Sequence, residues 1–163
     1  MLRPLLILLS IVVFTAAPGG LAAQQADTAK TIFRAIDIAP YGRVLLGKHF
    51  AYRLFRGRRI AEGRYELRGG QFADTRAIVI AVDSVNRVTA IDFNYLPGKR
   101  YAATVADYTT ALGRPVETHT RDSAGVRILV TRWEDAETGF EVASQQSGGS
   151  EAVTSRVTDR VHH

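Results

Sequence analysis

Cysteine is absent from this 163-residue sequence. The absence excludes disulfide bonds, thiolate metal sites and cysteine nucleophiles, and it leaves no residue to carry the lipid of a lipoprotein. A domain of about 140 residues does not depend on disulfides, because it buries roughly two thirds of the surface of its unfolded chain. An exported protein without cysteine is more typical of the bacterial periplasm or medium than of animal extracellular modules.

Motifs for catalysis are absent as well. No serine lies in a Gly-x-Ser-x-Gly or Ser-x-x-Lys motif, and no His-Glu-x-x-His pair occurs. Residues 42–48 match the Gly-x4-Gly-Lys part of a phosphate-binding loop, but His49 stands where the magnesium-binding Ser or Thr belongs. We therefore predict no catalytic residue, no metal site and no cofactor.

The first stretch of the chain has the features of an export signal. Arg3 provides a positive charge, residues 5–17 form an apolar run, and the small residues Ala22 and Ala23 follow. The run is shorter than the roughly 20 residues that span a bilayer. We expect residues 1–23 to be a cleaved signal peptide, residues 24–31 a flexible leader and residues 32–160 a single domain, located in the periplasm or secreted. A short uncleaved N-terminal anchor is the alternative, and no transmembrane segment is expected after cleavage.

A hairpin followed by a helix organises the predicted domain. Residues 77–82 form an apolar run, residues 88–96 alternate between apolar and polar, and Asn86 suits the positive φ of a turn between them. Residues 100–112 predict a helix with one apolar stripe, and Gly113 is placed to end it. The stripe is expected to pack on the sheet face that the second strand of the hairpin presents.

Three strands are predicted after the helix, over residues 126–133, 140–144 and 153–157, with the last of them at a sheet edge. Residues 135–139 predict a tight turn with Gly139 at positive φ. This order of elements favours an α+β fold in which one main helix packs on one face of an antiparallel β-sheet (hairpin, helix, meander).

The front of the domain is ambiguous. Residues 32–38 fit either a strand or a short helix. In residues 44–67 a four-residue apolar spacing fits a helix, whereas the alternation of aromatic and polar residues fits strands with a turn at residues 56–59. The β-branched and aromatic residues favour the strands. The front segment can also be interpreted as a degenerate copy of the later helix-plus-hairpin unit.

Three short stretches carry a family resemblance: Leu-Gly-Arg-Pro at residues 112–115, Trp-Glu-Asp at 133–135 and Gly-Phe-Glu-Val at 139–142. In their order after a helix they resemble the small envelope domains of the SmpA/OmlA type, whose architecture the β-lactamase inhibitor proteins share. The resemblance covers roughly residues 77–144 and implies a helical layer on an antiparallel sheet that binds other proteins. The chain differs from the SmpA/OmlA lipoproteins because it has no cysteine to carry a lipid.

Arginines crowd the segment from 43 to 68, which also contains four aromatic residues. The candidates for contact with an anionic group or a partner are Arg53, Arg56, Arg58, Arg59 and Arg64. Guanidinium groups next to aromatic rings can stack and still bind anions. The alternative is that these arginines only solvate two strands. Acidic residues at 134–137 are expected to form a solvated hairpin tip at the opposite end of the charge distribution.

These features favour a non-enzymatic exported binding or scaffold domain that contacts an envelope or extracellular protein through its open sheet face or its basic end. A small hydrolase or ligand-binding protein, with a site assembled in space from carboxylates and arginines, is one alternative. A peripheral binder of anionic membrane or glycan through the arginine-rich segment is another. Nucleic acid is not an expected partner outside the cytoplasm.

Overall fold

The computed structural model describes residues 31–68 and 74–162. The predicted signal peptide and nearly all of the predicted leader lie outside the described residues. In chain order the elements are β1 (Ala35–Ile38), β2 (Gly42–Leu45), β3 (Arg58–Ala61), β4 (Arg64–Arg68), β5 (Thr75–Val82), β6 (Val88–Tyr95), α1 (Tyr101–Leu112), β7 (Glu117–Ser123), β8 (Val126–Glu134), β9 (Thr138–Ser147) and β10 (Ser150–Asp159). None of the helical structure within these two ranges has the length and apolar character needed to cross a membrane.

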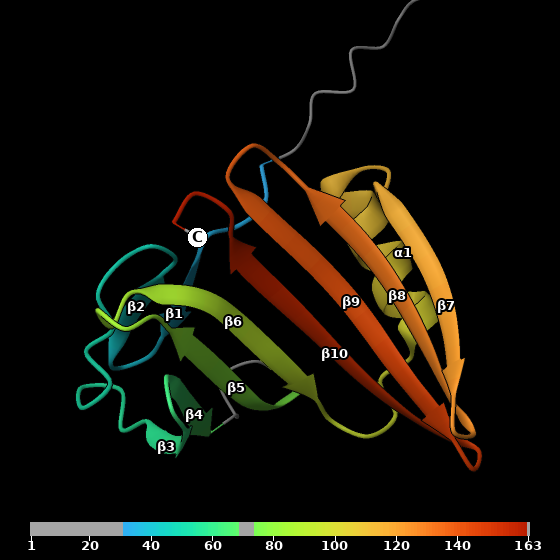
Figure 1. Cartoon of the computed structure of the whole chain (residues 1–163), viewed down its shortest axis with the longest axis horizontal. Coiled ribbons are helices and arrows are strands. Elements are labelled where there is room, and N and C mark those ends of the chain that lie inside the picture. The colour runs from blue at the N-terminus through green and yellow to red at the C-terminus, as the bar shows by residue number, and fades with distance from the viewer. Residues whose placement is uncertain (1–30, 69–73, 163) are drawn as a thin grey trace, which may run out of the picture.

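Two four-stranded meanders form one antiparallel sheet of eight strands (Figure 1). The first meander runs from β3 to β6 and the second from β7 to β10, so the order across the sheet is β3-β4-β5-β6-β10-β9-β8-β7. The meanders meet where β6 pairs with β10, with Ile91 opposite Val157. β1 and β2 form a separate hairpin. The predicted α+β class is confirmed in outline, but the strands take a larger share of the chain than the sequence indicates.

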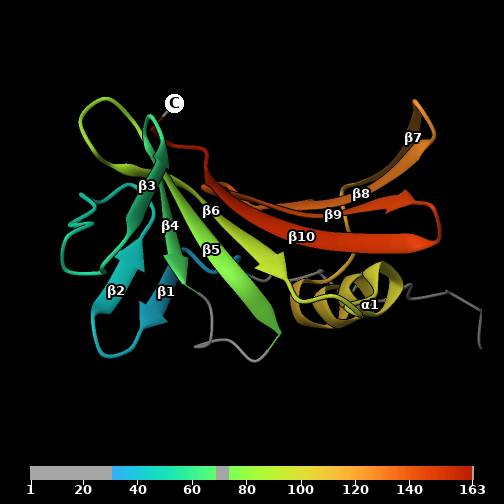
Figure 2. The same cartoon turned by 90° about the horizontal axis from the view of Figure 1, so that it is seen from below.

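One face of this sheet carries the hydrophobic core. Alternation along the strands directs Ile91, Phe140 and Val157 to the same face, and each is at most 1 % exposed. The β1–β2 hairpin and α1 both cover this face, as Figure 2 shows, and the turns of residues 46–57 add Phe50 and Phe55 to the same core. The opposite face has no covering element among the described residues.

The helix is confirmed within one residue of its predicted start. Its apolar stripe packs against the core, and the helix ends at Gly113, whose φ of 87° favours glycine and whose N–H bonds to the Thr109 carbonyl. The indole N–H of Trp133 donates to the Gly113 carbonyl at 2.9 Å, so the end of the helix is fixed to β8. The hairpin of β5 and β6 is likewise confirmed, with Asn86 at φ 63° in its turn.

The segment before β1 is bonded to the turn between β8 and β9 and to the end of β10. The Ile32 amide donates to the Asp135 carboxylate at 2.8 Å, and the Arg34 guanidinium pairs with Glu137 and with the buried Asp159, both at 3.0 Å. The acidic hairpin tip is therefore only partly a solvated feature, because it anchors the beginning of the domain.

Two predictions for the front of the domain are resolved by β1 to β4. The strand alternative is right for residues 32–38, where β1 lies, and strands also occupy part of the segment 44–67. The turn predicted at residues 56–59 is wrong, since β3 begins at Arg58 and its turn to β4 is at Glu62-Gly63. Residues 50–57 form turns and not a strand. Phe50 and Phe55 stack on each other in the core, with ring centroids 5.4 Å apart, whereas Leu54, which fits the alternation of a strand, is exposed.

Two predictions for the end of the domain are also wrong. β10 is a central strand, between β6 and β9, and not an edge strand. Thr154, Arg156 and Thr158 alternate with its buried residues and so face the uncovered side of the sheet, which gives a central strand the composition of an edge. Gly139 lies inside β9 without a positive φ, and glycine fits there because a Cβ atom would stand 2.8 Å from the hydroxyl of Thr158. The edge strands of the sheet are β3 and β7, and the sequence does not predict β7 because this strand contains no apolar residue.

Candidate functional site

The five predicted arginines do not form one cluster. Arg58, Arg59 and Arg64 belong to β3 and β4, whereas Arg53 and Arg56 lie in the preceding turns. Arg58 pairs with Glu66 and Arg64 with Asp92, both at 2.9 Å.

The other three arginines have no carboxylate partner in the described part of the chain. The guanidinium of Arg53 lies 5.8 Å from the ring centre of Tyr52, and that of Arg56 lies 5.7 Å from the ring centre of Tyr41. Arg59 donates to the Ala61 carbonyl at 3.4 Å. The predicted stacking of arginines on aromatic rings therefore exists. Each stacked arginine lies against a tyrosine of this chain, and the guanidinium groups do not gather into one positively charged site.

The uncovered sheet face places carboxylates next to Arg58 and Arg64. A single row of residues in register crosses all eight strands, with alternating charge over most of its length. From β3 to β7 the row is Arg58, Glu66, Val79, Asp92, Arg156, Glu141, Arg132 and Glu117. Opposite charges in directly facing positions attract across strands. Two facing pairs of the row form ion pairs, Arg58 with Glu66 at 2.9 Å and Arg156 with Asp92 at 2.7 Å, so positive and negative charges are interspersed on this face.

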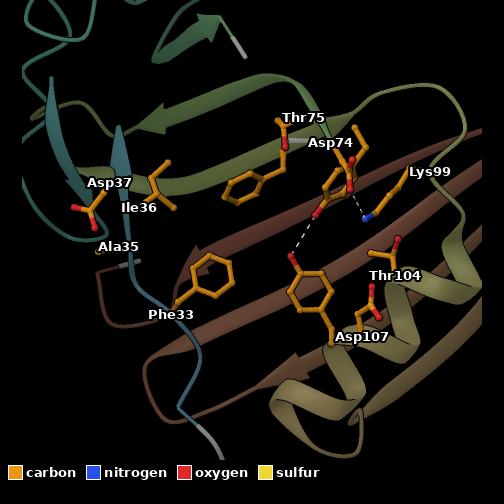
Figure 3. A pocket seen from close by; sticks show the side chains of 12 residues that line it. Phe33, Ala35, Ile36, Asp37, Asp74, Thr75, Lys99, Thr104 and Asp107 are labelled. Atoms are coloured by element: carbon orange, nitrogen blue, oxygen red, sulfur yellow. Dashed lines mark hydrogen bonds and ion pairs between the residues drawn. The ribbon is translucent and has the colours of Figure 1, made fainter. Parts of the chain in front are cut away.

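The covered face contains a groove, here called the β1–α1 groove. It has a volume of about 570 Å³ and lies between the β1 segment on one side and α1 on the other, with β5 and β6 as its floor (Figure 3). Ala35, Ile36 and Asp37 line it from β1, while Thr104 and Asp107 line it from α1. Sites that bind small molecules commonly have volumes of roughly 300–1,000 Å³.

The floor of the groove is aromatic and apolar. Phe93 from β6 is 7 % exposed and contacts Phe33 edge to face, with ring centroids 6.2 Å apart. Ile36 extends the apolar surface on the β1 side. Phe93 lies on the sheet, whereas Phe33 and Ile36 belong to the β1 segment, and the groove follows from the separation of this segment from α1.

Hydroxyl groups from two tyrosines meet on the α1 side of the floor. The Tyr95 hydroxyl is 2.8 Å from the Ser155 hydroxyl and 3.3 Å from that of Tyr108. Burial raises the pKa of the Tyr108 phenol well above its usual value, and the neighbouring Tyr95 raises it further. The Tyr108 phenol is therefore neutral at physiological pH and provides a polar contact without charge.

Charged side chains stand around the mouth of the groove, and two of its three carboxylates are already paired. Lys99 bonds to Asp74 at 3.0 Å, and its ammonium lies 5.5 Å from the ring centre of Tyr95. Asp37 accepts two hydrogen bonds from Arg43, which lower the pKa of the Asp37 carboxyl. Asp107, exposed on α1, has no ion-pair partner within residues 31–68 and 74–162.

The lining offers binding groups and no reactive pair. Its hydroxyls are held by other groups of the protein: Thr104 donates to the Arg100 carbonyl at 2.8 Å, and Tyr95 bonds to Ser155. No histidine lies among the described residues that line the groove, and the carboxylates in the lining are Asp37, Asp74 and Asp107. Across the described ranges, no three side chains of the metal-binding types gather closely enough to hold a metal ion.

The sequence prediction of a site pointed to the arginines and missed this groove. One signal for it was present, since the apolar stripe of α1 was expected on the sheet face that carries Phe93 and Tyr95. The stripe contains Tyr108, which lines the groove. The contributions of Phe33 and Asp74 have no such signal, because they depend on where β1 and the start of β5 lie in space.

Comparisons with protein-family models, with characterised protein sequences and with solved structures found no match to this chain.

Proposed function

We propose that this protein is an exported, non-catalytic binding protein that takes a small ligand into the β1–α1 groove. The observation that carries the proposal is the groove itself, an apolar and aromatic floor between two covering elements that leaves room for about 570 Å³ of ligand. Binding of a ligand that removes such apolar surface from water is favourable. The hydroxyls of Tyr95 and Tyr108 supply the few polar contacts that orient a ligand in such sites.

The groove is a better candidate than the arginine-rich segment. Arg58 of β3 and Arg64 of β4 have carboxylate partners, and Arg53 and Arg56 in the turns before β3 lie against tyrosine rings. An exposed cation that is already paired contributes little to recognition of another anion.

A variant that fills the groove tests this function. Ala35→Trp places an indole in the groove from β1, whereas Ala152→Trp places the same group on the exposed face of β10 and serves as the matched control. Ligand-observed NMR with a set of small aromatic fragments is expected to show binding to the wild type and to Ala152→Trp, and loss of binding to Ala35→Trp. Circular dichroism checks that both variants are folded. Fragments that bind Ala35→Trp as well as the wild type would contradict the proposed site.

Export rests on the leader sequence and has its own test. The full chain, expressed in a bacterium with a Sec pathway, is expected to yield a mature protein that begins at Ala23 or Gln24, as cleavage after Ala22 or Ala23 requires. Leu8→Arg interrupts the apolar run, and its product is expected to keep the leader. Intact mass of the wild-type protein with all residues present would contradict export by this route.

A further inference from the structure

We infer that the ligand of the β1–α1 groove is a small organic cation: an aromatic or apolar body that carries one ammonium group. This inference rests on the proposed function and specifies the chemistry of the ligand. The apolar body is set by the floor, where Phe33, Phe93 and Ile36 provide no charged or hydrogen-bonding group. The positive charge of the ligand is inferred from the carboxylates at the mouth of the groove.

One of the three carboxylates at the mouth of the groove has no ion-pair partner among the described residues. Asp74 and Lys99 neutralise each other at 3.0 Å, and Arg43 neutralises Asp37 through two hydrogen bonds. Asp107 remains, on the face of α1 that lines the groove, without an ion-pair partner among the described residues. A ligand that enters past Asp107 therefore meets one uncompensated negative charge.

The tyrosines of the groove reinforce this preference. Tyr95 already holds one ammonium against its ring, that of Lys99 at 5.5 Å from the ring centre. Tyr108, the residue that follows Asp107, packs its ring against that of Phe140 with ring centroids 4.4 Å apart, and its hydroxyl lies 3.3 Å from that of Tyr95. The contact between Lys99 and the Tyr95 ring shows that an ammonium group fits against the aromatic wall of this groove, where a ring face attracts a cation.

An anionic ligand fits this groove poorly. Among the described residues that line it, Lys99 is the only cation, and its ion pair with Asp74 would have to open before Lys99 served a ligand. Asp107 would repel the ligand throughout. The groove thus has a local electrostatic preference opposite to that of the whole chain, whose formal net charge is +5.

Three indole compounds of nearly equal size and different charge test the inference: tryptamine (cation), tryptophol (neutral) and indole-3-propionate (anion). Each is titrated into isotope-labelled protein, and the dissociation constant is measured from amide chemical shifts. Tryptamine is expected to bind about fivefold more tightly than tryptophol, the effect of an ion pair at the edge of solvent, and indole-3-propionate more weakly than both. The advantage of tryptamine is expected to decrease with added salt.

Two variants locate the charge that causes this preference. Asp107→Asn removes the charge at an exposed helix position and is expected to bring tryptamine to the affinity of tryptophol, with tryptophol unchanged. Glu62→Gln, at the exposed turn between β3 and β4, removes a carboxylate far from the groove and is expected to leave all three affinities unchanged.

The outcomes separate this inference from the proposed function. Equal affinities for the three compounds, or an unchanged preference in Asp107→Asn, overturn the cationic ligand while the groove stands as a binding site. Failure of all three to bind also overturns it, and the fragment experiment with Ala35→Trp still decides whether the groove binds ligands at all.

Discussion

The guanidinium of Arg34 lies 3.0 Å from the carboxylate of Asp159, a side chain that is only 1 % exposed. The two residues are 125 positions apart, so this ion pair joins the segment that leads into β1 to the end of β10. The imidazole of His162 and the Val161 amide also bond to Asp159. A buried carboxylate with three partners stabilises the fold only while those partners are in place.

Arg34→Gln is therefore expected to destabilise the protein. Removal of the guanidinium leaves Asp159 buried without its permanent positive charge, which typically costs about 3 kcal/mol. Urea unfolding followed by tryptophan fluorescence measures the change in the free energy of unfolding. Arg43→Gln is the control, because it breaks the exposed pair with Asp37, and we expect it to leave the free energy of unfolding nearly unchanged. Equal effects of the two substitutions would show that burial of Asp159 does not govern the energy of its pair.

Stability is expected to fall at acid pH because of the same carboxylate. Burial raises the pKa of Asp159, but hydrogen bonds from His162, the Val161 amide and Arg34 outweigh it and hold the pKa below its ordinary value. In the unfolded chain an aspartate takes up its proton near pH 3.9. The stabilisation is therefore complete above about pH 4 and is lost as the pH falls from there through the lower pKa of the folded state.

The free energy of unfolding, measured between pH 6 and pH 2.5, checks this dependence. Asp159→Asn should be less stable than the wild type near neutral pH, and its stability should fall less steeply below pH 4. Asp122→Asn, an exposed change on β7, should keep the wild-type slope. Parallel curves for the wild type and Asp159→Asn would rule out this carboxylate as the cause.

Alkaline pH is expected to act through Tyr108. The raised pKa of its phenol means that the folded protein keeps the proton above pH 10, where the tyrosines of the unfolded chain release theirs. The contribution of Tyr108 to stability is thus complete below about pH 10 and is lost as the pH rises further. Absorbance of tyrosinate in the folded protein should show one phenol that titrates late or only on unfolding, and Tyr108→Phe should remove that step. A late step that persists in Tyr108→Phe would assign it to another of the six tyrosines.

Gly139→Ala tests the tight contact between β9 and β10. The new methyl group would lie 2.8 Å from the Thr158 hydroxyl, so a cost of about 1–3 kcal/mol is expected from overpacking. Thr158→Ala removes the hydroxyl, and the double variant is expected to recover part of the loss. Additive effects of the two substitutions in thermal or urea unfolding would contradict a clash between them.

The β5–β6 hairpin and α1 could be predicted because their signals lie within short stretches of sequence. The β5–β6 hairpin follows from its alternation and from Asn86, and α1 follows from its stripe and Gly113. β7 could not be predicted because pairing with β8 alone makes it a strand. The central place of β10 is likewise set by the pairing with β6, a contact between distant segments that no local pattern encodes.

The candidate site was less predictable than the fold. A linear sequence shows which side chains are charged but not which charges are paired, so Arg58 and Arg64 stood out although Glu66 and Asp92 neutralise them. Asp107 shows the reverse case, because nothing in the sequence distinguishes it from other acidic residues. Its place as the unpaired carboxylate of the groove depends on Asp37 and Asp74 having other partners.

The order of the strands in the sheet has a consequence for biosynthesis. β10 is the last of the eight to emerge from the ribosome, yet it fills the seam between the two meanders. Until residue 159 has been translated, the nascent polypeptide holds two half-sheets with nothing to join them. The eight-stranded sheet can therefore form only after the last strand of the domain has been made.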